Sequence, residues 1–308
     1  MAKILLATEK PFAAEAVDGI ATIFSEVGYE LVKLEKYDSK EELKAAIADA
    51  DGIIFRSDKI DKEVLEAANK LKIAVRAGAG YDNIDLEVAS TKDVVVMNTP
   101  GQNSNAVAEL GFGMLVYLNR GGFNGKAGIE LRSKKLGIHA YGHIGKIMGD
   151  IGKGFGMKVY AYDPFVDPTF IENDGVKAED DVKSLYQKCQ YIAVNLPAND
   201  KTKGSINYKL MMSMPEGATL LNTARKEIVN EEDLIKVFEA RDDFRYVTDV
   251  APDCKDEIEK RFPERFFFTP KKMGAQTAEA NVNAGLAAAR QIVGYLENGD
   301  NTFQVNKL

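Results

Sequence analysis

Several residue types that mark particular functions are scarce in this sequence. The 308 residues include only two cysteines, Cys189 and Cys254, whose spacing fits no metal-binding or redox motif and suits a reducing compartment. No apolar run approaches the roughly 20 residues needed to cross a bilayer, and the apolar segment at the N-terminus is too short for a signal peptide. We therefore expect a cytoplasmic protein with no membrane partner.

Positive charge is also not in excess. The formal net charge is -7 at pH 7, which argues against a nucleic-acid-binding protein, because such proteins normally carry a basic face. A local basic pocket for an anionic substrate remains compatible with this charge. The hydrophobic fraction of 45% and the length of 308 residues are those of a globular enzyme with room for two domains.

Short apolar segments alternate with helical patterns along the chain. In a first series we expect strands at Lys3–Ala7, Tyr29–Leu34, Gly52–Phe55, Ile73–Ala77 and Val94–Met97. In a second series we expect them at Lys135–Ala140, Lys158–Tyr162, Gln190–Asn195, Ala218–Asn222, Tyr246–Asp249 and Phe266–Thr269. This alternation predicts an α/β protein with two doubly wound parallel sheets. We expect a long apolar helix at Ala106–Tyr117 to lead from one unit to the other, and a last helix, about Ala278–Leu296, to return to the first.

A glycine-rich loop joins the first strand of the second series to a helix. Its sequence, Leu136-Gly-Ile-His-Ala-Tyr-Gly-His-Ile-Gly145, matches G-x-G-x-x-G except that Ala140 replaces the first glycine. In such loops the glycine at 142 lets the backbone approach a pyrophosphate, and the one at 145 lets the helix pack closely on the strand. An alanine costs little where its φ is negative. Asp163, 18 positions after the last glycine, ends the next strand. A carboxylate there binds adenosine ribose hydroxyls, so we expect NAD rather than NADP.

Ordered motifs along nearly the whole chain resemble the D-2-hydroxyacid dehydrogenase family. Besides the glycine loop they are Arg76-Ala-Gly-Ala-Gly-Tyr-Asp-Asn-Ile-Asp85, Asn105-Ala-Val-Ala-Glu-Leu110, Glu130-Leu-Arg132, Asn222-Thr-Ala-Arg225, Thr248-Asp-Val250 and Met273-Gly-Ala-Gln-Thr277. The closest likeness is to short D-3-phosphoglycerate dehydrogenases that lack a regulatory domain. The resemblance implies a Rossmann NAD-binding domain at 99–276, inserted into a split flavodoxin-like substrate domain at 1–98 and 277–308.

The resemblance also implies roles for individual residues. Arg225 would pair with the substrate carboxylate and polarise its carbonyl, since a guanidinium is always charged and binds two oxygens in one plane. The backbone of Gly78, Ala79 and Gly80 would hold the same carboxylate. The residues implied to bind the cofactor are Gly142, His143, Ile144, Gly145, Asp163, Thr223, Ala224, Arg225, Asp249 and Gly274.

Phosphate recognition is implied by three further positions. Arg56, Ser57 and Asn103 resemble residues that contact the substrate phosphate in phosphoglycerate dehydrogenases. An arginine at the carboxyl end of a strand is well placed for an anion. The alternative interpretation of Arg56 is an ordinary surface salt bridge, which is the usual role of an isolated arginine.

The acid/base residue departs from the family pattern. The family uses a histidine in Thr-Pro-His-x-Gly, whereas this chain reads Thr269-Pro-Lys-Lys-Met-Gly274. The chain has only two histidines, His139 and His143, and both belong to the glycine loop. We expect Lys272 to take the role, or Lys271 if the segment is aligned from its proline.

The family's glutamate, which orients the histidine, is missing as well. Cys254 falls at its position, with Asp253 beside it as the nearest carboxylate. A histidine needs such a partner to raise its pKa, but a lysine, with a pKa near 10.4 in peptides, is protonated without it. A nearby cation such as Arg225, together with partial burial, would bring the lysine pKa closer to the working pH.

These observations predict an NAD-dependent oxidoreductase that converts 3-phosphoglycerate to 3-phosphohydroxypyruvate, the first step of phosphorylated serine biosynthesis, and the reverse. One alternative is a hydroxypyruvate or glyoxylate reductase, in which Arg56 would meet no phosphate. Another is an NAD-sensing binding protein that has lost catalysis. We expect a homodimer, but the family contact often includes a tryptophan, and this chain has none. The segment Gly121-Gly-Phe-Asn-Gly125 occupies that region.

Overall fold

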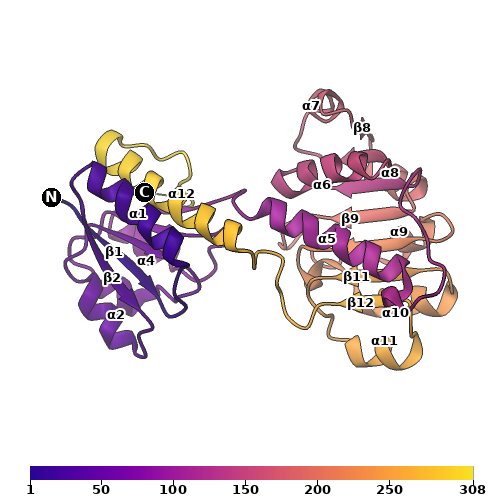
Figure 1. The fold of residues 1–308 in the computed structure, drawn as a ribbon, viewed down its shortest axis with the longest axis horizontal. Coiled ribbons are helices and arrows are strands. Elements are labelled where there is room, and N and C mark those ends of the chain that lie inside the picture. Colours follow the sequence, from indigo (N-terminus) through magenta and orange to yellow (C-terminus); the bar gives the residue numbers. More distant parts are fainter. Residues whose placement is uncertain (308) are drawn as a thin grey trace. The chain divides into compact units, whose positions relative to one another are not determined.

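Two series of parallel strands follow one another in the computed structural model, which describes residues 1–307. Met1–Asn103 and the segment from Ala275 onward form one unit, and Ser104–Gly274 form the other (Figure 1). The first unit is therefore built from both ends of the described chain. Domain boundaries after residues 98 and 276 stay a prediction, because this division does not test independent folding.

The first unit contains a five-stranded sheet in the order β2-β1-β3-β4-β5, and every pairing is parallel. Its strands are β1 (Lys3–Thr8), β2 (Glu30–Glu35), β3 (Gly52–Phe55), β4 (Ile73–Arg76) and β5 (Val95–Asn98). Its helices are α1 (Ala14–Glu26), α2 (Lys40–Ile47), α3 (Lys62–Ala67), α4 (Leu86–Thr91) and α12 (Ala278–Asn298). This strand order is the flavodoxin-like one, so the predicted fold of this unit is confirmed.

The burial of the strands explains why they lie in this order. All four residues of β3 are buried, as a strand covered on both faces requires. At the edge, β2 has no fully buried residue. The C-terminal helix α12 returns to the first unit, as predicted, and there it lies alongside α1 (Figure 1). A Cβ on Gly19 would lie 2.5 Å from Leu286 Cδ2, so the absence of a side chain there permits this close approach.

The second unit contains a seven-stranded sheet in the order β12-β11-β10-β9-β6-β7-β8, again with every pairing parallel. Its strands are β6 (Lys135–His139), β7 (Lys158–Tyr162), β8 (Lys177–Ala178), β9 (Tyr191–Val194), β10 (Thr219–Asn222), β11 (Arg245–Thr248) and β12 (Phe266–Phe268). The direction of strand addition reverses between β6 and β9, as in dinucleotide-binding folds. The predicted Rossmann architecture is confirmed.

Helices connect these strands. They are α5 (Ser104–Asn119), α6 (His143–Gly154), α7 (Pro168–Asn173), α8 (Val182–Lys188), α9 (Tyr208–Ser213), α10 (Glu231–Ala240) and α11 (Lys255–Arg261), with short 3-10 turns η1 (Gly121–Phe123) and η2 (Lys226–Ile228). The sequence did not predict α7, α8, α9, α11 or β8 as separate elements. Among residues 1–307, no helix is both long and apolar enough to cross a membrane.

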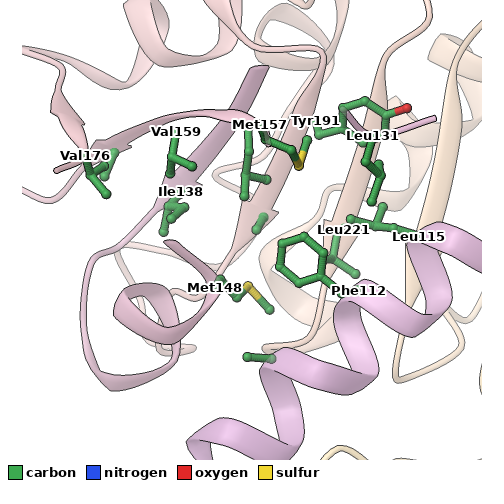
Figure 2. Packing of buried hydrophobic residues seen from close by; sticks show 14 of the residues in the cluster. Phe112, Leu115, Leu131, Ile138, Met148, Met157, Val159, Val176, Tyr191 and Leu221 are labelled. Atoms are coloured by element: carbon green, nitrogen blue, oxygen red, sulfur yellow. The ribbon is translucent and has the colours of Figure 1, made fainter. Parts of the chain in front are cut away.

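The core of the second unit holds α5 and α6 against the sheet. Figure 2 shows Phe112 and Leu115 of α5 lying beside Met148 of α6 and Leu221 of β10. A Cβ on Gly111 would lie 3.0 Å from Met148 Cε, so the two helices pack closely. This packing fixes the N-terminus of α6 at the carboxyl edge of the sheet, where the glycine loop lies.

Candidate active site

The glycine loop connects β6 to α6, as the sequence predicted. Gly142 is the residue before the first turn of α6, and a Cβ there would meet nothing within 4 Å. A Cβ on Gly145 would lie 2.4 Å from the carbonyl oxygen of Ala140. The first position is thus open to a ligand, and the second is closed by helix–strand packing. A helix N-terminus of this kind favours a pyrophosphate, so the loop fits NAD.

Ala140 adopts a conformation that the sequence argument did not foresee. Its φ is +78°, in the left-handed region. An L-residue with a Cβ pays roughly 1–2 kcal/mol there, whereas glycine does not. The condition of a negative φ, under which alanine would cost little, does not hold here. The departure from G-x-G-x-x-G therefore stores strain in the loop.

Asp163 follows β7 and anchors the loop. Its Oδ2 accepts a hydrogen bond from the Tyr141 amide at 2.8 Å, and its Oδ1 accepts one from the Phe165 amide at 2.9 Å. An ionised carboxylate has further lone pairs for ribose hydroxyls. His139, at the end of β6, is buried with its Nδ1 3.2 Å from the Tyr186 hydroxyl, and burial lowers its pKa to about 4. It is thus a neutral core residue at pH 7.

The turn after β10 carries Arg225 and is shaped by Asn222. The Asn222 amide donates to the Arg225 carbonyl at 2.9 Å, and its oxygen accepts from the Ala224 amide at 3.0 Å. Thr223 is buried beside it, whereas the Arg225 side chain is exposed. Arg225 Nη1 donates to the Ala224 carbonyl oxygen at 3.1 Å. The guanidinium is therefore held over this turn.

Asp249 organises the loop that carries both lysines. Its carboxylate is buried and accepts hydrogen bonds from the Met273 amide at 2.9 Å, the Gly274 amide at 2.8 Å and the Thr269 hydroxyl at 3.1 Å. A Cβ on Gly274 would lie 2.8 Å from Asp249 Oδ2, so only glycine fits this contact without a shift. The carboxylate predicted to line the cofactor thus also holds the backbone just after Lys272.

Lys272 lies close to Arg225. Its Nζ donates to the Ala224 carbonyl oxygen at 3.4 Å, the same oxygen that Arg225 uses. The nearby cation that the sequence argument expected is therefore present. Both Lys272 and Lys271 are exposed, so the expected partial burial is not found in this structure.

Asp253 and Cys254, where the family's glutamate is missing, take part in a separate set of polar contacts. Asp253 forms an ion pair with Lys226 and is largely exposed. The amides of Asp253 and Cys254 donate to Glu231 at 2.9 and 2.8 Å. Burial, reinforced by the Glu231 charge, raises the pKa of the Cys254 thiol to about 12. Glu231, which lies far from this segment in the chain, was not among the predicted site residues. A catalytic role for Asp253 stays a prediction.

In the first unit, Arg56 follows β3. Its guanidinium donates to the Asn281 side-chain oxygen and lies 5.1 Å from the centre of the Phe12 ring. Burial lowers its pKa. Both of these contacts are with neutral groups, and Arg56 is in none of the ion pairs found among residues 1–307. The Asp58 charge acts on Arg56 without a direct ion pair, so phosphate binding by Arg56 stays a prediction, and Ser57 beside it is exposed.

The predicted carboxylate loop follows β4. Gly78 has φ +153°, and a Cβ there would lie 1.8 Å from Arg76 Nη1. The φ would strain any other residue there, and its Cβ would displace the Arg76 guanidinium. The Asn98 amide donates to the Ala79 carbonyl at 2.6 Å, which holds the loop before Gly80. Asn103 is the last residue of the N-terminal segment of this unit and is partly buried.

Comparison with known proteins identifies relatives of this chain. Residues 115–270 match the family model described as D-isomer specific 2-hydroxyacid dehydrogenase, NAD binding domain. Over 82% of its length the chain is 34% identical to D-3-phosphoglycerate dehydrogenase of Methanocaldococcus jannaschii, of which it covers 51%. Over 85% of its length it is 33% identical to hydroxypyruvate reductase of Thermotoga maritima, of which it covers 90%. The chain thus spans about half the length of the first relative and most of the second.

A solved structure is similar over the whole chain. It is the NAD+-bound 3-phosphoglycerate dehydrogenase of Entamoeba histolytica, which is 48% identical with a TM-score of 0.86. The match covers 100% of this chain and 99% of that one.

Proposed function

The chain belongs to the D-isomer specific 2-hydroxyacid dehydrogenase family, and from that membership we propose that it interconverts 3-phosphoglycerate and 3-phosphohydroxypyruvate with NAD. The observation that carries the proposal is the shared carbonyl of Ala224, which brings the Arg225 guanidinium and the Lys272 ammonium together. One cation binds and polarises a 2-oxo acid, and the other supplies a proton. Reduction of NAD+ by 3-phosphoglycerate, followed by absorbance, tests the activity.

Each residue has a distinct chemical role in this proposal. Bound NAD supplies the hydride acceptor for oxidation and the hydride donor for reduction. Arg225 binds the substrate carboxylate in a planar, two-oxygen contact and stabilises charge on the carbonyl oxygen. In reduction, Lys272 gives its proton to that oxygen. In oxidation, the neutral Lys272 amine takes the hydroxyl proton while the carbon loses hydride, so protons and electrons balance.

The paired lysines provide a matched test of the acid/base assignment. Lys272→Ala should lower kcat by at least about 100-fold, the scale of general acid catalysis, while the Kd for NADH changes little. Lys271→Ala is the control, because it removes the same type of side chain from the neighbouring position. Comparable losses in both variants, or a larger loss for Lys271→Ala, would contradict the assignment to Lys272.

Phosphate specificity rests on Arg56. The partly buried Arg56 guanidinium contacts an amide oxygen and an aromatic ring and forms no ion pair with a carboxylate, so it can still pair with a phosphate. Arg56→Gln should raise KM for 3-phosphohydroxypyruvate while leaving hydroxypyruvate turnover nearly unchanged. An equal loss for both substrates would instead indicate a structural role. NAD rather than NADP is supported by Asp163, whose charge repels a 2′-phosphate.

A second candidate function is reduction of hydroxypyruvate or a similar unphosphorylated acid. Similarity to the hydroxypyruvate reductase of Thermotoga maritima, over 90% of that protein, favours it. Arg225 and Lys272 would act in the same way on that substrate. The two functions differ in whether Arg56 contacts a substrate phosphate. Comparing the effect of Arg56→Gln on the phosphorylated and the unphosphorylated substrate therefore separates them.

We infer that the protein acts as a cytoplasmic homodimer. The two cysteines are both free, which suits a reducing compartment. On the second unit, Tyr117, Phe123, Ile129 and Phe155 are all exposed, and Phe123 reaches 65%. Tyr117 meets the Phe123 ring edge-on at 5.3 Å. Such an apolar surface suits a partner copy. Light scattering of Phe123→Asp, expected to show a shift toward monomer, tests the contact.

A further inference from the structure

Asp58 is a buried carboxylate that lies in the same segment as Arg56. Its Oδ1 accepts hydrogen bonds from the Glu9 amide at 2.7 Å and the Tyr37 hydroxyl at 2.8 Å, and its Oδ2 accepts one from the Arg56 amide at 3.1 Å. All three donors are uncharged. Because a buried carboxylate is unfavourable unless its oxygens are hydrogen-bonded, these donors explain how Asp58 is tolerated. What they connect indicates what it does.

The three donors come from the loops after three neighbouring strands. Glu9 directly follows β1, Tyr37 comes shortly after β2, and Arg56 directly follows β3. The strands are adjacent in the order β2-β1-β3, so their carboxyl ends lie at one edge of the five-stranded sheet. Burial, reinforced by the hydrogen bond to Asp58, raises the pKa of Tyr37, so its hydroxyl keeps its proton and stays a donor. Asp58 thus fastens three loops to one another at the edge where Arg56 lies.

The backbone of Arg56 is held from both sides. Its amide donates to Asp58, and its carbonyl oxygen accepts from Arg76 Nε at 3.1 Å and from Asn83 Nδ2 at 3.0 Å. The same Asn83 nitrogen donates to the Asp58 carbonyl at 2.6 Å. Side chains therefore fix the peptide groups on both sides of the Arg56 Cα, in a connecting segment that would otherwise be free to move.

Asp58 also constrains the surface on which the Arg56 side chain lies. The guanidinium is placed over the Phe12 ring and donates to the Asn281 side-chain oxygen. Phe12 is buried and belongs to the loop that begins at Glu9, whose amide Asp58 holds. Asp58 therefore acts on the backbone of Arg56 directly and on its side chain through this loop.

We propose that Asp58 is a positioning residue that holds the Arg56 guanidinium in place for the substrate phosphate and so favours the phosphorylated substrate. This rests on the proposed phosphate contact of Arg56. By charge alone Asp58 would weaken that contact, because a carboxylate near Arg56 competes with an anion for the same cation. Its benefit therefore comes from geometry. A guanidinium that is already in place loses less conformational freedom when it binds two phosphate oxygens.

Asp58→Asn separates geometry from charge. Asparagine has the same shape, with one acceptor oxygen and one NH2 group. It keeps the most bonds when its oxygen faces the Glu9 amide and the Tyr37 hydroxyl, and its nitrogen then faces the Arg56 amide, where two donors meet. The variant should therefore release the Arg56 backbone specifically. Amide hydrogen exchange, followed by NMR, should speed up at Arg56 and stay near the wild-type rate at Glu9.

The kinetic effect should be confined to the phosphorylated substrate. In NADH oxidation assays of the full chain, Asp58→Asn should raise KM for 3-phosphohydroxypyruvate about tenfold, the value of one well-placed charge-assisted contact, with kcat nearly unchanged. KM and kcat for hydroxypyruvate should stay the same, because that substrate brings no phosphate to Arg56. Thermal unfolding checks that the variant is folded at the assay temperature.

Asp61→Asn is the matched control. Asp61 lies in the same segment and also accepts a hydrogen bond from a backbone amide, that of Val64, as the N-cap of α3. Asparagine caps helices about as well as aspartate, so this variant removes a nearby negative charge without releasing a loop, and its kinetics should match wild type. If Asp58→Asn does not fold, Tyr37→Phe removes one of the three donors and should raise the same KM by a smaller factor, about threefold.

The outcomes separate the inference from the proposed function. Equal losses for both substrates in Asp58→Asn would show that Asp58 only stabilises the fold, and a lower KM for 3-phosphohydroxypyruvate would show that its charge outweighs its geometry. Either result overturns the positioning role. An unchanged KM in Asp58→Asn, where Arg56→Gln does raise it, overturns the inference alone. If Arg56→Gln itself leaves that KM unchanged, the proposed phosphate contact fails and the inference fails with it.

Discussion

Replacing Asp249 by asparagine should release the lysine loop while leaving the rest of the second unit folded. The carboxylate holds this loop through the amides of Met273 and Gly274 and the hydroxyl of Thr269. Asparagine has one acceptor oxygen and one donor nitrogen in place of two oxygens. Whichever way the new amide turns, its nitrogen faces a backbone N–H that has lost its acceptor.

The size of the effect follows from this count. One buried backbone donor left without a partner costs about 1–3 kcal/mol, and the remaining bonds lose the strengthening that a charged acceptor gives. We expect Asp249→Asn to lower the free energy of unfolding by about 2–4 kcal/mol. Because the loop carries Lys272, a displacement on the order of 1 Å should also lower kcat about 100-fold.

Urea unfolding measures the loss of stability, and amide hydrogen exchange measures the release of the lysine loop. Exchange should speed up at Met273 and Gly274 and stay unchanged in β10 and β11. Asp49→Asn, which alters an exposed carboxylate paired with Lys3, is the control and should leave kcat unchanged. Wild-type exchange at both loop amides together with wild-type kcat would refute the argument that Asp249 positions the lysine.

Three further predictions concern the glycine loop, acid stability and the pH profile. Ala140→Gly should stabilise the protein by about 0.5–1 kcal/mol in urea unfolding, because glycine relieves the strain at φ +78° and loses part of that gain to chain entropy. Burial lowers the pKa of His139 from 6.5 to about 4, so the unfolded chain binds a proton in this range that the folded chain does not. The free energy of unfolding should therefore fall by about 3 kcal/mol as the pH drops from 6.5 to about 4. In urea unfolding at several pH values, His139→Gln should not show this contribution to the loss. Finally, oxidation of 3-phosphoglycerate should run faster as the pH rises, since Lys272 must first lose its proton, and a flat initial-rate profile between pH 7 and pH 10 would contradict this.

The fold was predictable because most strands are continuous apolar runs separated by turns and helices. Gly52–Phe55 and Lys158–Tyr162 have the predicted bounds in the structure. The helices that were missed, such as α9 and α11, have six and seven residues. Such segments complete fewer than about two turns, so their apolar spacing is too short to identify a period.

The site was less predictable than the fold. The glycine loop and Arg225 have local sequence signals, but the positive φ of Ala140 does not. Glu231 accepts a hydrogen bond from the Cys254 amide although it belongs to another helix, and no sequence pattern predicts that contact.

The central claim is that this chain acts on a phosphorylated 2-hydroxy acid, and one measurement tests it most directly. NADH oxidation by the purified protein should be followed with 3-phosphohydroxypyruvate and with hydroxypyruvate under the same conditions. We expect a kcat/KM at least about tenfold higher for the phosphorylated substrate, the value of one good charge-assisted contact to Arg56. Equal or higher kcat/KM for hydroxypyruvate would contradict it.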